Sequence, residues 1–375
     1  MALLPFTRPT IDEATIAAVA DTLRSGWIAS GARVKQFEQA LSDYIGGRPV
    51  RVVTSATEAL EIALLVCGIG PGDEVITPAM SFAATANVIC RVGARPVFVD
   101  VDLASRNIDV AATARAITPR TKAIMPVHFA GLAIDMDGLY TLARQHRLRV
   151  IEDAACAIGT LHQGRRIGSF GDIVCFSFHP NKNMTSIEGG AIVLPDASAV
   201  DAVEQHRFHG IRKDAAGQVA DVLFPGAKAN LSDVAAAVGL AQLARLEEFN
   251  ARRRELVALY YSRLSTTPAF SLPARGDGGH SWHIFAPLLP LSELSIDRAG
   301  YIAAMRAQDI GVGIHYPALH LFSCYRKQGW NPGDFPNAER IGASIVTLPL
   351  FPLMSEQDVD RVISASRQIF AENRR

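Results

Sequence analysis

The sequence predicts an α/β fold in which a large, mainly parallel sheet of seven strands is followed by a smaller α+β domain. Three observations support this prediction. Short β-branched runs alternate with helix-like stretches through the first two thirds of the chain, as they do in βαβ units. Longer helical patterns follow after about Ser232, and the length of 375 residues exceeds the usual size of a single hydrophobic core.

The strand candidates are short runs rich in β-branched residues, and each run is flanked on both sides by turn residues. In chain order they are residues 51–54, 74–77, 96–101, 122–127, 148–152, 172–178 and 191–194. The helical candidates in the same part of the chain are residues 11–23, 57–67, 83–92 and 136–146. Because strands and helices alternate, most strands of the sheet should be parallel.

The second domain is expected to begin within a long helix. Residues 233–249 show a helical pattern that continues toward Leu264, and a glycine-rich break follows at residues 275–279. We therefore divide the chain into a large domain, residues 1–245, and a small domain, residues 246–375. The elements expected in the small domain are strands at residues 283–289 and 311–315 and helices at residues 298–308 and 356–370.

The charge balance argues against a nucleic-acid-binding protein, and the cysteine content is typical of a reduced, intracellular one. Lys+Arg and Asp+Glu both number 37, and the scattered basic residues lack the concentrated surface that nucleic-acid binding requires. The five cysteines are widely spaced and stand mostly in apolar runs, as reduced core residues do. Because neither a signal-peptide pattern nor a bilayer-spanning apolar run is present, we expect a soluble cytoplasmic protein without a membrane partner.

Lys182 is the strongest functional signal in the sequence. It lies in residues 176–183, on a loop between two expected buried strands and shortly before a glycine pair, Gly189 and Gly190. Burial lowers the pKa of a lysine and frees its lone pair for imine formation. We therefore expect Lys182 to carry pyridoxal phosphate (PLP). The alternative, from spacing alone, is a solvated lysine at a strand end.

Asp153 follows the predicted strand at residues 148–152, where a buried carboxylate needs a cation as its partner. The protonated pyridine nitrogen of PLP is such a cation, and its protonation makes the ring an electron sink. The alternative role of Asp153 is to cap the turn at Ala154 and Ala155.

A phosphate site is predicted where residues 55–60 follow a strand and open a helix. The backbone N–H groups of Ala56 and Thr57 would point at an anion at the helix N-terminus, and the hydroxyl of Ser177 could bind the same phosphate. The alternative is an ordinary helix cap by Ser55 or Thr57.

No metal site is expected. His206 with His209, and His280 with His283, have spacings that metal sites use, but neither pair has a cysteine or acidic ligand set nearby.

Residues 55–60, 152–155 and 176–190 together resemble the DegT/StrS-type nucleotide-sugar aminotransferases, which are PLP enzymes of fold type I, the aspartate aminotransferase fold. The resemblance covers nearly the whole chain, from residues 25–28 to residues 348–352. Within the family the chain looks most like the UDP-4-amino-4-deoxy-L-arabinose aminotransferases, judged from residues 4–9, 25–28 and 126–131.

The resemblance implies a set of site residues. Catalytic roles fall to Lys182, which forms the imine with PLP, and Asp153, which pairs with the pyridinium nitrogen. The implied cofactor contacts are Ala56, Thr57, Phe82, Asp153, Cys156, Ser177, Lys182 and Asn230. The implied substrate contacts are Trp27, Ile28, His179, Tyr316 and His320.

Three of these residues carry further implications. Phe82 would stack on the cofactor ring, although arabinose-type relatives have a bulkier Trp there. Cys156 stands where family members often have Gln or His beside the cofactor. Asn230 would reach the phosphate bound by the neighbouring subunit, which implies a homodimer with shared active sites.

The implied reaction moves an amino group from glutamate, through pyridoxamine phosphate (PMP), to the keto carbon of a nucleotide-diphosphate sugar. We expect a 4-keto, UDP-linked sugar used for envelope polysaccharide or lipopolysaccharide, with 2-oxoglutarate as coproduct. One alternative is a PLP-dependent sugar dehydratase, but such relatives typically carry His in place of the lysine, and this chain keeps Lys182. Another is a non-catalytic regulator that binds a sugar nucleotide in the same pocket.

Overall fold

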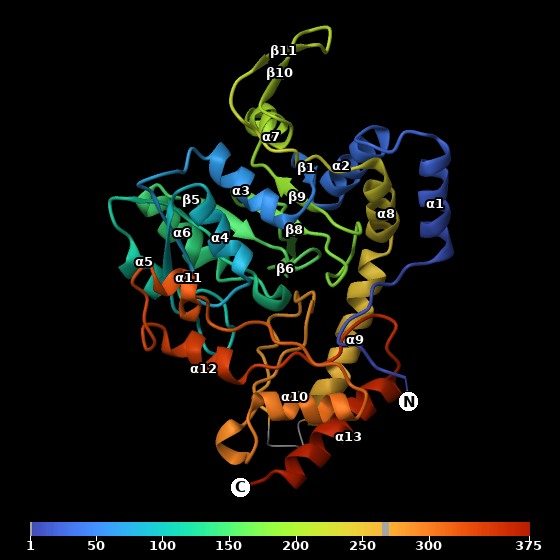
Figure 1. The fold of residues 1–375 in the computed structure, drawn as a ribbon, viewed down its shortest axis with the longest axis vertical. Coiled ribbons are helices and arrows are strands. Elements are labelled where there is room, and N and C mark those ends of the chain that lie inside the picture. The colour runs from blue at the N-terminus through green and yellow to red at the C-terminus, as the bar shows by residue number, and fades with distance from the viewer. Residues whose placement is uncertain (1, 265–269) are drawn as a thin grey trace.

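A computed structural model describes residues 2–264 and 270–375. A seven-stranded sheet lies at its centre (Figure 1). In spatial order its strands are β1 (Val50–Val53), β9 (Gly190–Val193), β8 (Ile173–Ser177), β5 (Arg149–Asp153), β4 (Thr121–Ile124), β2 (Glu74–Pro78) and β3 (Arg95–Val99). Strand β9 is antiparallel to both its neighbours, and the other six strands are parallel to one another. All seven predicted strands are confirmed.

The central strands are buried on both faces, which explains why they appear in the sequence as continuous apolar runs. In β8, Val174 and Phe176 belong to the core on one face of the sheet, while Ile173 and Cys175 belong to the core on the other. The side chains therefore alternate between two cores rather than between a core and solvent.

Helices cover both faces of the sheet. One core contains residues of α2 (Ala32–Tyr44), α5 (Val110–Ala116), α6 (Met136–His146) and α8 (Asp233–Ala244), and the other contains residues of α3 (Ala56–Val66), α4 (Ala83–Arg91) and α7 (Val200–Arg207). Helix α1 (Glu13–Arg24) packs on the outer side of α8. The four helices predicted in this part of the chain, now α1, α3, α4 and α6, are confirmed.

The C-terminal part has a core of its own. It is built from α9 (Leu246–Leu264), α10 (Arg298–Ala307) and α13 (Glu356–Glu372), which lie together at the bottom of Figure 1. Leu4 joins this core through a bridge to Ile310, so the first residues of the chain pack with its last third. Arg245 separates α8 from α9, which places a helix break at the proposed boundary.

The remaining elements are short. Two hairpins pair β6 (Leu161–His162) with β7 (Arg165–Arg166), and β10 (Ile211–Lys213) with β11 (Val219–Val222). The second hairpin projects from the body at the top of Figure 1. The small helices are α11 (Ser323–Arg326), α12 (Pro336–Ser344) and the 3-10 turns Phe129–Gly131, Ala197–Ala199, Leu291–Glu293 and Leu319–Leu321. Within the described ranges, no helix combines the length and the apolar character needed to cross a membrane.

The two strands predicted in the small domain were wrong as regular strands. At residues 283–289 and 311–315 the structure has isolated bridges instead, among them Phe285 with Leu348, Leu288 with Ile345 and Gly313 with Thr347. The apolar residues of 283–289 are buried and those of 311–315 are partly buried, but each segment pairs over too few consecutive residues to form a ladder. Helices α10 and α13 confirm the two predicted helices.

Candidate active site

A cavity of about 230 Å³ lies where several parallel strands end. Ligands of open α/β sheets bind outside the carboxyl ends of the strands. The predicted site residues that line the cavity are Ala56, Thr57, Phe82, Asp153, Cys156, Ser177, His179, Lys182 and Tyr316. Nine of the predicted positions, widely separated in the sequence, thus meet in one place.

The topology explains this convergence. Asp153 is the last residue of β5 and Ser177 the last residue of β8, while Ala56 begins the helix that follows β1. These three strands are parallel, so their carboxyl ends meet at one edge of the sheet. Lys182 lies on the loop that connects β8 to the antiparallel strand β9, which returns from that same edge.

The start of α3 forms an anion site. The Ser55 side chain accepts a hydrogen bond of 3.1 Å from the Glu58 N–H, so the helix is capped in the ordinary way. The backbone N–H groups of Ala56 and Thr57 have no partner within the described residues. Capping and anion binding are therefore compatible, since Ser55 satisfies one N–H and leaves the two that line the cavity available.

Gly190 allows β9 to approach this helix start closely. A Cβ added at Gly190 would lie 2.5 Å from the Ser55 carbonyl carbon and 2.6 Å from the Ala56 nitrogen. Both atoms belong to the backbone and cannot move aside without displacing the helix. The glycine pair noted in the sequence thus keeps the anion site compact.

Asp153 is buried with defined hydrogen bonds to both carboxylate oxygens. Oδ2 accepts from Thr85 Oγ1 at 2.7 Å, and Oδ1 accepts from the Ala155 N–H at 3.1 Å. Burial raises the pKa of Asp153, and the bonds from Thr85 and Ala155 and the charge of Lys182 offset this only in part. A cationic ring nitrogen against this carboxylate would stabilise its charged form.

Lys182 is partly buried, and its Nζ donates to Cys156 Sγ at 3.3 Å. Burial by itself lowers the pKa of this amine, as predicted from the sequence. The prediction was nevertheless wrong in direction, because Cys156, Tyr316 and Asp153 together raise the pKa above its ordinary value. The amine is therefore protonated at neutral pH in the protein alone, and it must lose that proton before it reacts with a carbonyl group.

Aromatic and polar side chains complete the wall. The ring of Phe82 is 59% exposed and lies 5.9 Å from the ring of Tyr316. Exposed His179 contacts Asn181 Oδ1 through Nδ1 at 2.8 Å, and its Nε2 lies 3.8 Å from Glu188 Oε1. Cys156 is buried, and burial raises the pKa of its thiol, although the charge of Lys182 opposes this shift.

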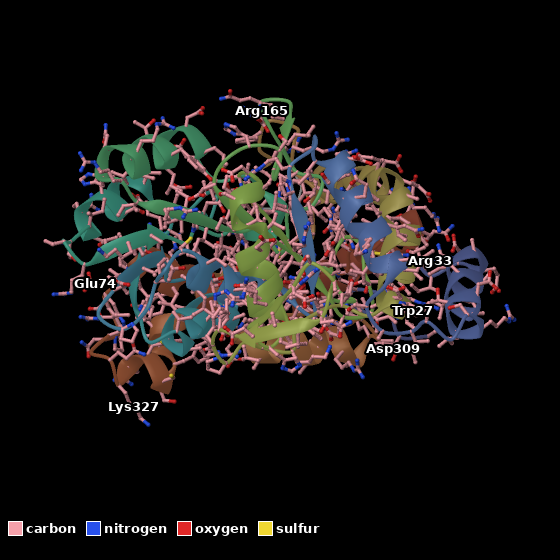
Figure 2. All side chains as sticks on the ribbon, turned by 90° about the horizontal axis from the view of Figure 1, so that it is seen from above. Trp27, Arg33, Glu74, Arg165, Asp309 and Lys327 are labelled. Carbon is pink, nitrogen blue, oxygen red and sulfur yellow. The ribbon has the colours of Figure 1, made fainter. Side chains whose placement is uncertain are left out.

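Four predicted residues do not line the cavity. Trp27 and Ile28 are exposed, and Figure 2 places Trp27 near Arg33, on the side of the molecule away from Glu74. Asn230 bonds to Ser30 and Lys228 beside the end of β1. None of these three residues is fully buried.

His320 is the fourth, and the structure places it away from the cavity. The side chain is completely buried, its Nε2 lies 2.9 Å from Glu339 Oε1, and its ring packs edge-on against Phe335. This packing belongs to the cluster that joins the small domain to the sheet domain. Tyr316, from the same motif at residues 314–320, lines the cavity, so only one of these two predicted substrate contacts lies at the site.

Sequence reasoning missed three residues of the site. Ser81 and Thr85 form a chain to Asp153, with a Ser81 Oγ to Thr85 Oγ1 distance of 2.7 Å. No spacing signal marks them, because they contact Asp153 only through the fold. His315 lines the cavity next to Tyr316, and its place in the same motif could have identified it.

The lining fits PLP. An amine, a buried carboxylate that needs a cation, and two unpartnered N–H groups at a helix start face one cavity of a small ligand's size. No cluster of three or more His, Cys, Asp or Glu side chains suited to a metal ion occurs in the part of the chain that the structure describes.

The chain is similar to known proteins over nearly its whole length. The sequence model of the DegT/DnrJ/EryC1/StrS aminotransferase family matches residues 9–367. The spore coat polysaccharide biosynthesis protein SpsC of Bacillus subtilis (strain 168) is 40% identical over 376 residues, covering 98% of this chain and 97% of SpsC.

Solved structures share the fold. Spr1654 from Streptococcus pneumoniae is 32% identical with a TM-score of 0.93; its PLP form covers 99% of both chains, and its PMP form covers 99% of this chain and 98% of that one. PseC of Helicobacter pylori, an aminotransferase involved in the biosynthesis of pseudoaminic acid, is 26% identical with a TM-score of 0.93, over 99% of this chain and 100% of PseC. Fold type I and the PLP cofactor, with PMP as its aminated form, are thereby confirmed.

Proposed function

The chain belongs to the DegT/DnrJ/EryC1/StrS aminotransferase family, and on that basis we propose that it moves an amino group from glutamate to C4 of a nucleotide-diphosphate 4-ketosugar. It is a PLP-dependent sugar aminotransferase. The observation that carries the proposal is the meeting of Lys182, Asp153 and the α3 N-terminus around one cavity.

Each of these groups has a separate task in the proposed reaction. Bound PLP supplies an electron sink for the electrons left behind when a proton leaves the substrate carbon. Lys182 Nζ, once free, takes that proton and returns it to the neighbouring carbon, acting as general base and then as general acid. The Asp153 carboxylate holds a proton on the ring nitrogen, which keeps the ring electron-poor.

Binding and orientation fall to the surrounding residues. The N–H groups of Ala56 and Thr57, with the hydroxyl of Ser177, bind the phosphate group at the positive end of the α3 dipole. Phe82 covers one face of the ring. These contacts would hold the ring in one orientation relative to Lys182 Nζ, the group that moves the proton.

The relatives support a role in glycan synthesis. SpsC is a spore coat polysaccharide biosynthesis protein, and PseC is an aminotransferase involved in the biosynthesis of pseudoaminic acid. We propose that this chain serves an envelope polysaccharide or lipopolysaccharide. Its five free cysteines are compatible with a reducing cytoplasm, the proposed location.

A homodimer with shared sites is part of the proposal. Trp27, Ile28 and Ile187 expose large apolar side chains, as do Val219 and Val222 on the projecting hairpin. Burying these side chains against a second copy would remove apolar surface from water. Asn230, which lies outside its own cavity, would then contact the phosphate bound by the partner.

A panel experiment tests the function. Enzyme loaded with PMP is mixed with UDP-, dTDP- and GDP-linked 3-keto and 4-keto sugars, and the visible absorption of the PLP form is followed. We expect it to return with a UDP-linked 4-ketosugar, and glutamate should remove it again. The Lys182→Ala variant should do neither. A ketosugar consumed without amine transfer would favour the dehydratase alternative, and binding without any reaction would favour the regulator.

A further inference from the structure

His315 lines the cavity but has no part in the mechanism above. Its Nδ1 lies 2.8 Å from Thr347 Oγ1, and Thr347 is itself fixed by two backbone hydrogen bonds with Gly313, of 3.0 and 2.8 Å. A Cβ added at Gly313 would lie 2.9 Å from His315 Cε1, so the glycine makes room for the ring. The imidazole is therefore held in one orientation by a neighbouring segment.

The second ring nitrogen is the available one. Nε2 of His315 has no hydrogen-bond partner among the described residues. It is also absent from the polar side-chain atoms that are fully buried without a partner, so a ligand can reach it. With Nδ1 occupied by Thr347, Nε2 is the atom left for a ligand in the cavity. Oriented polar atoms of this kind give a ligand pocket its specificity.

The charge state decides what His315 can bind. Burial and the charge of Lys182 lower the pKa of His315 to about 4, so the ring is neutral at physiological pH. A neutral imidazole is a poor general acid there and a weak partner for a carboxylate. It pairs well with a hydroxyl group, which can donate or accept to suit either tautomer.

The adjoining wall also suits a sugar. The rings of His315 and Tyr316 lie 4.9 Å apart, and the Tyr316 ring also contacts Phe82, the residue proposed to cover the cofactor. An aromatic ring next to one oriented polar atom matches a sugar ring, which has an apolar face and hydroxyl groups at its edge. The amino donor, whose recognition depends on carboxylates, gains nothing comparable from this wall.

We propose that His315 Nε2 hydrogen-bonds a hydroxyl group of the sugar ring and thereby determines specificity in the sugar half-reaction but not in the amino-donor half-reaction. This inference rests on the proposed function and deepens it. Thr347 is the positioning residue that keeps Nε2 directed at the sugar.

Half-reaction kinetics test the inference. For His315→Phe we expect the rate with glutamate to stay within twofold of wild type, while the apparent affinity for UDP-4-keto-6-deoxyglucose falls about tenfold, the effect of one lost hydrogen bond. His315→Gln, which keeps a polar end, should recover part of the loss. Thr347→Val should also weaken the apparent affinity for the ketosugar, but by a smaller factor than His315→Phe. His146→Gln, an exposed histidine on α6, is the matched control.

Binding gives a readout that does not depend on turnover. In calorimetric titrations of the PMP form, the 4-amino sugar nucleotide should bind His315→Phe about tenfold more weakly, whereas UDP alone should bind both proteins equally. Equal losses in the two half-reactions, a loss with UDP, or no loss at all would overturn the role of His315. If the wild-type enzyme reacts with no ketosugar of the panel, the proposed function itself fails. If the wild-type enzyme reacts normally and His315→Phe does so equally well, only the role of His315 fails.

Discussion

At the scale of one residue, the buried carboxylate of Asp153 is unfavourable for the stability of the cofactor-free protein. Its carboxylate is buried, and its pKa is raised by burial. A folded-state pKa above the unfolded value means that stability is lost as the pH rises through that range. Under the proposed function, a cationic ring nitrogen of bound PLP against the carboxylate would remove this cost.

The sign of this shift gives a prediction for the cofactor-free protein. Asp153→Asn removes the ionisation, so we expect its melting temperature relative to wild type to rise steadily between about pH 4 and pH 7. Differential scanning fluorimetry over that range measures it. Transamination by the same variant should fall by about a hundredfold or more, because the ring nitrogen loses its carboxylate. A melting-temperature difference that shrinks with rising pH would contradict the direction of the shift.

Thr85 supports Asp153 from α4, and its hydrogen bond to Oδ2 lowers the pKa of that carboxyl. Thr85→Val removes the bond, so the charged form should become less stable and PLP should bind about tenfold more weakly. Fluorescence titration of the cofactor-free protein measures the affinity. Thr113→Val is the control, since Thr113 is equally buried but bonds only to the Asp109 carbonyl oxygen, away from the cavity. Equal effects of the two substitutions would count against the role of Thr85.

Sequence reasoning identified the residues whose chemistry is local and missed those whose role comes from packing. Lys182 and Asp153 stand out beside their own strands. The raised pKa of Lys182 depends on Cys156 and Tyr316, which the fold brings to it from distant parts of the chain. Burial, the only effect visible in the sequence, pointed the other way.

At the scale of elements, the junction of β9 with α3 determines the geometry of the proposed phosphate site. Gly190→Ala should push the α3 start outward, because the new Cβ meets backbone atoms at 2.5 and 2.6 Å. We expect PLP affinity to fall at least about tenfold and the melting temperature to drop by several degrees. Gly70→Ala is the matched control, since its Cβ would meet only the Val92 carbonyl oxygen at 3.7 Å. Tight PLP binding by Gly190→Ala would show that the close approach is not required.

The strands were predictable from the sequence where every residue of the strand is buried. Strands such as β8 are apolar throughout because both of their faces are covered, and turn residues mark their ends. In the small domain the same composition produced only isolated bridges. The sequence cannot distinguish the two cases, because ladder length depends on the partner strand rather than on the run itself.

At the scale of the whole molecule, the proposed site needs two copies of the chain. Asn230 and Trp27 lie outside the cavity that their own chain forms, and the hairpin of β10 and β11 extends away from the body (Figure 1). In the proposed homodimer, these residues of one chain would complete the cavity of the other.

Subunit mixing tests this arrangement. Lys182→Ala and Asn230→Ala homodimers should each have low activity, the first through lost chemistry and the second through weaker phosphate binding. After dissociation and reassociation, mixed dimers should contain one site with both wild-type residues. We therefore expect activity to rise toward half the wild-type value per mixed dimer. No recovery would contradict sharing of Asn230, and sedimentation of a fully active monomer would contradict the dimer.

The central claim is that Lys182 is the amine that holds PLP, and chemical labelling tests it most directly. Borohydride reduction of the PLP-loaded protein should fix the cofactor on one lysine, which peptide mass spectrometry identifies. We predict the added mass on the peptide that contains Lys182, with none on Lys228 or on the other lysines. The same mass on a different lysine, or no fixed mass in protein that absorbs as the PLP form, would contradict the account.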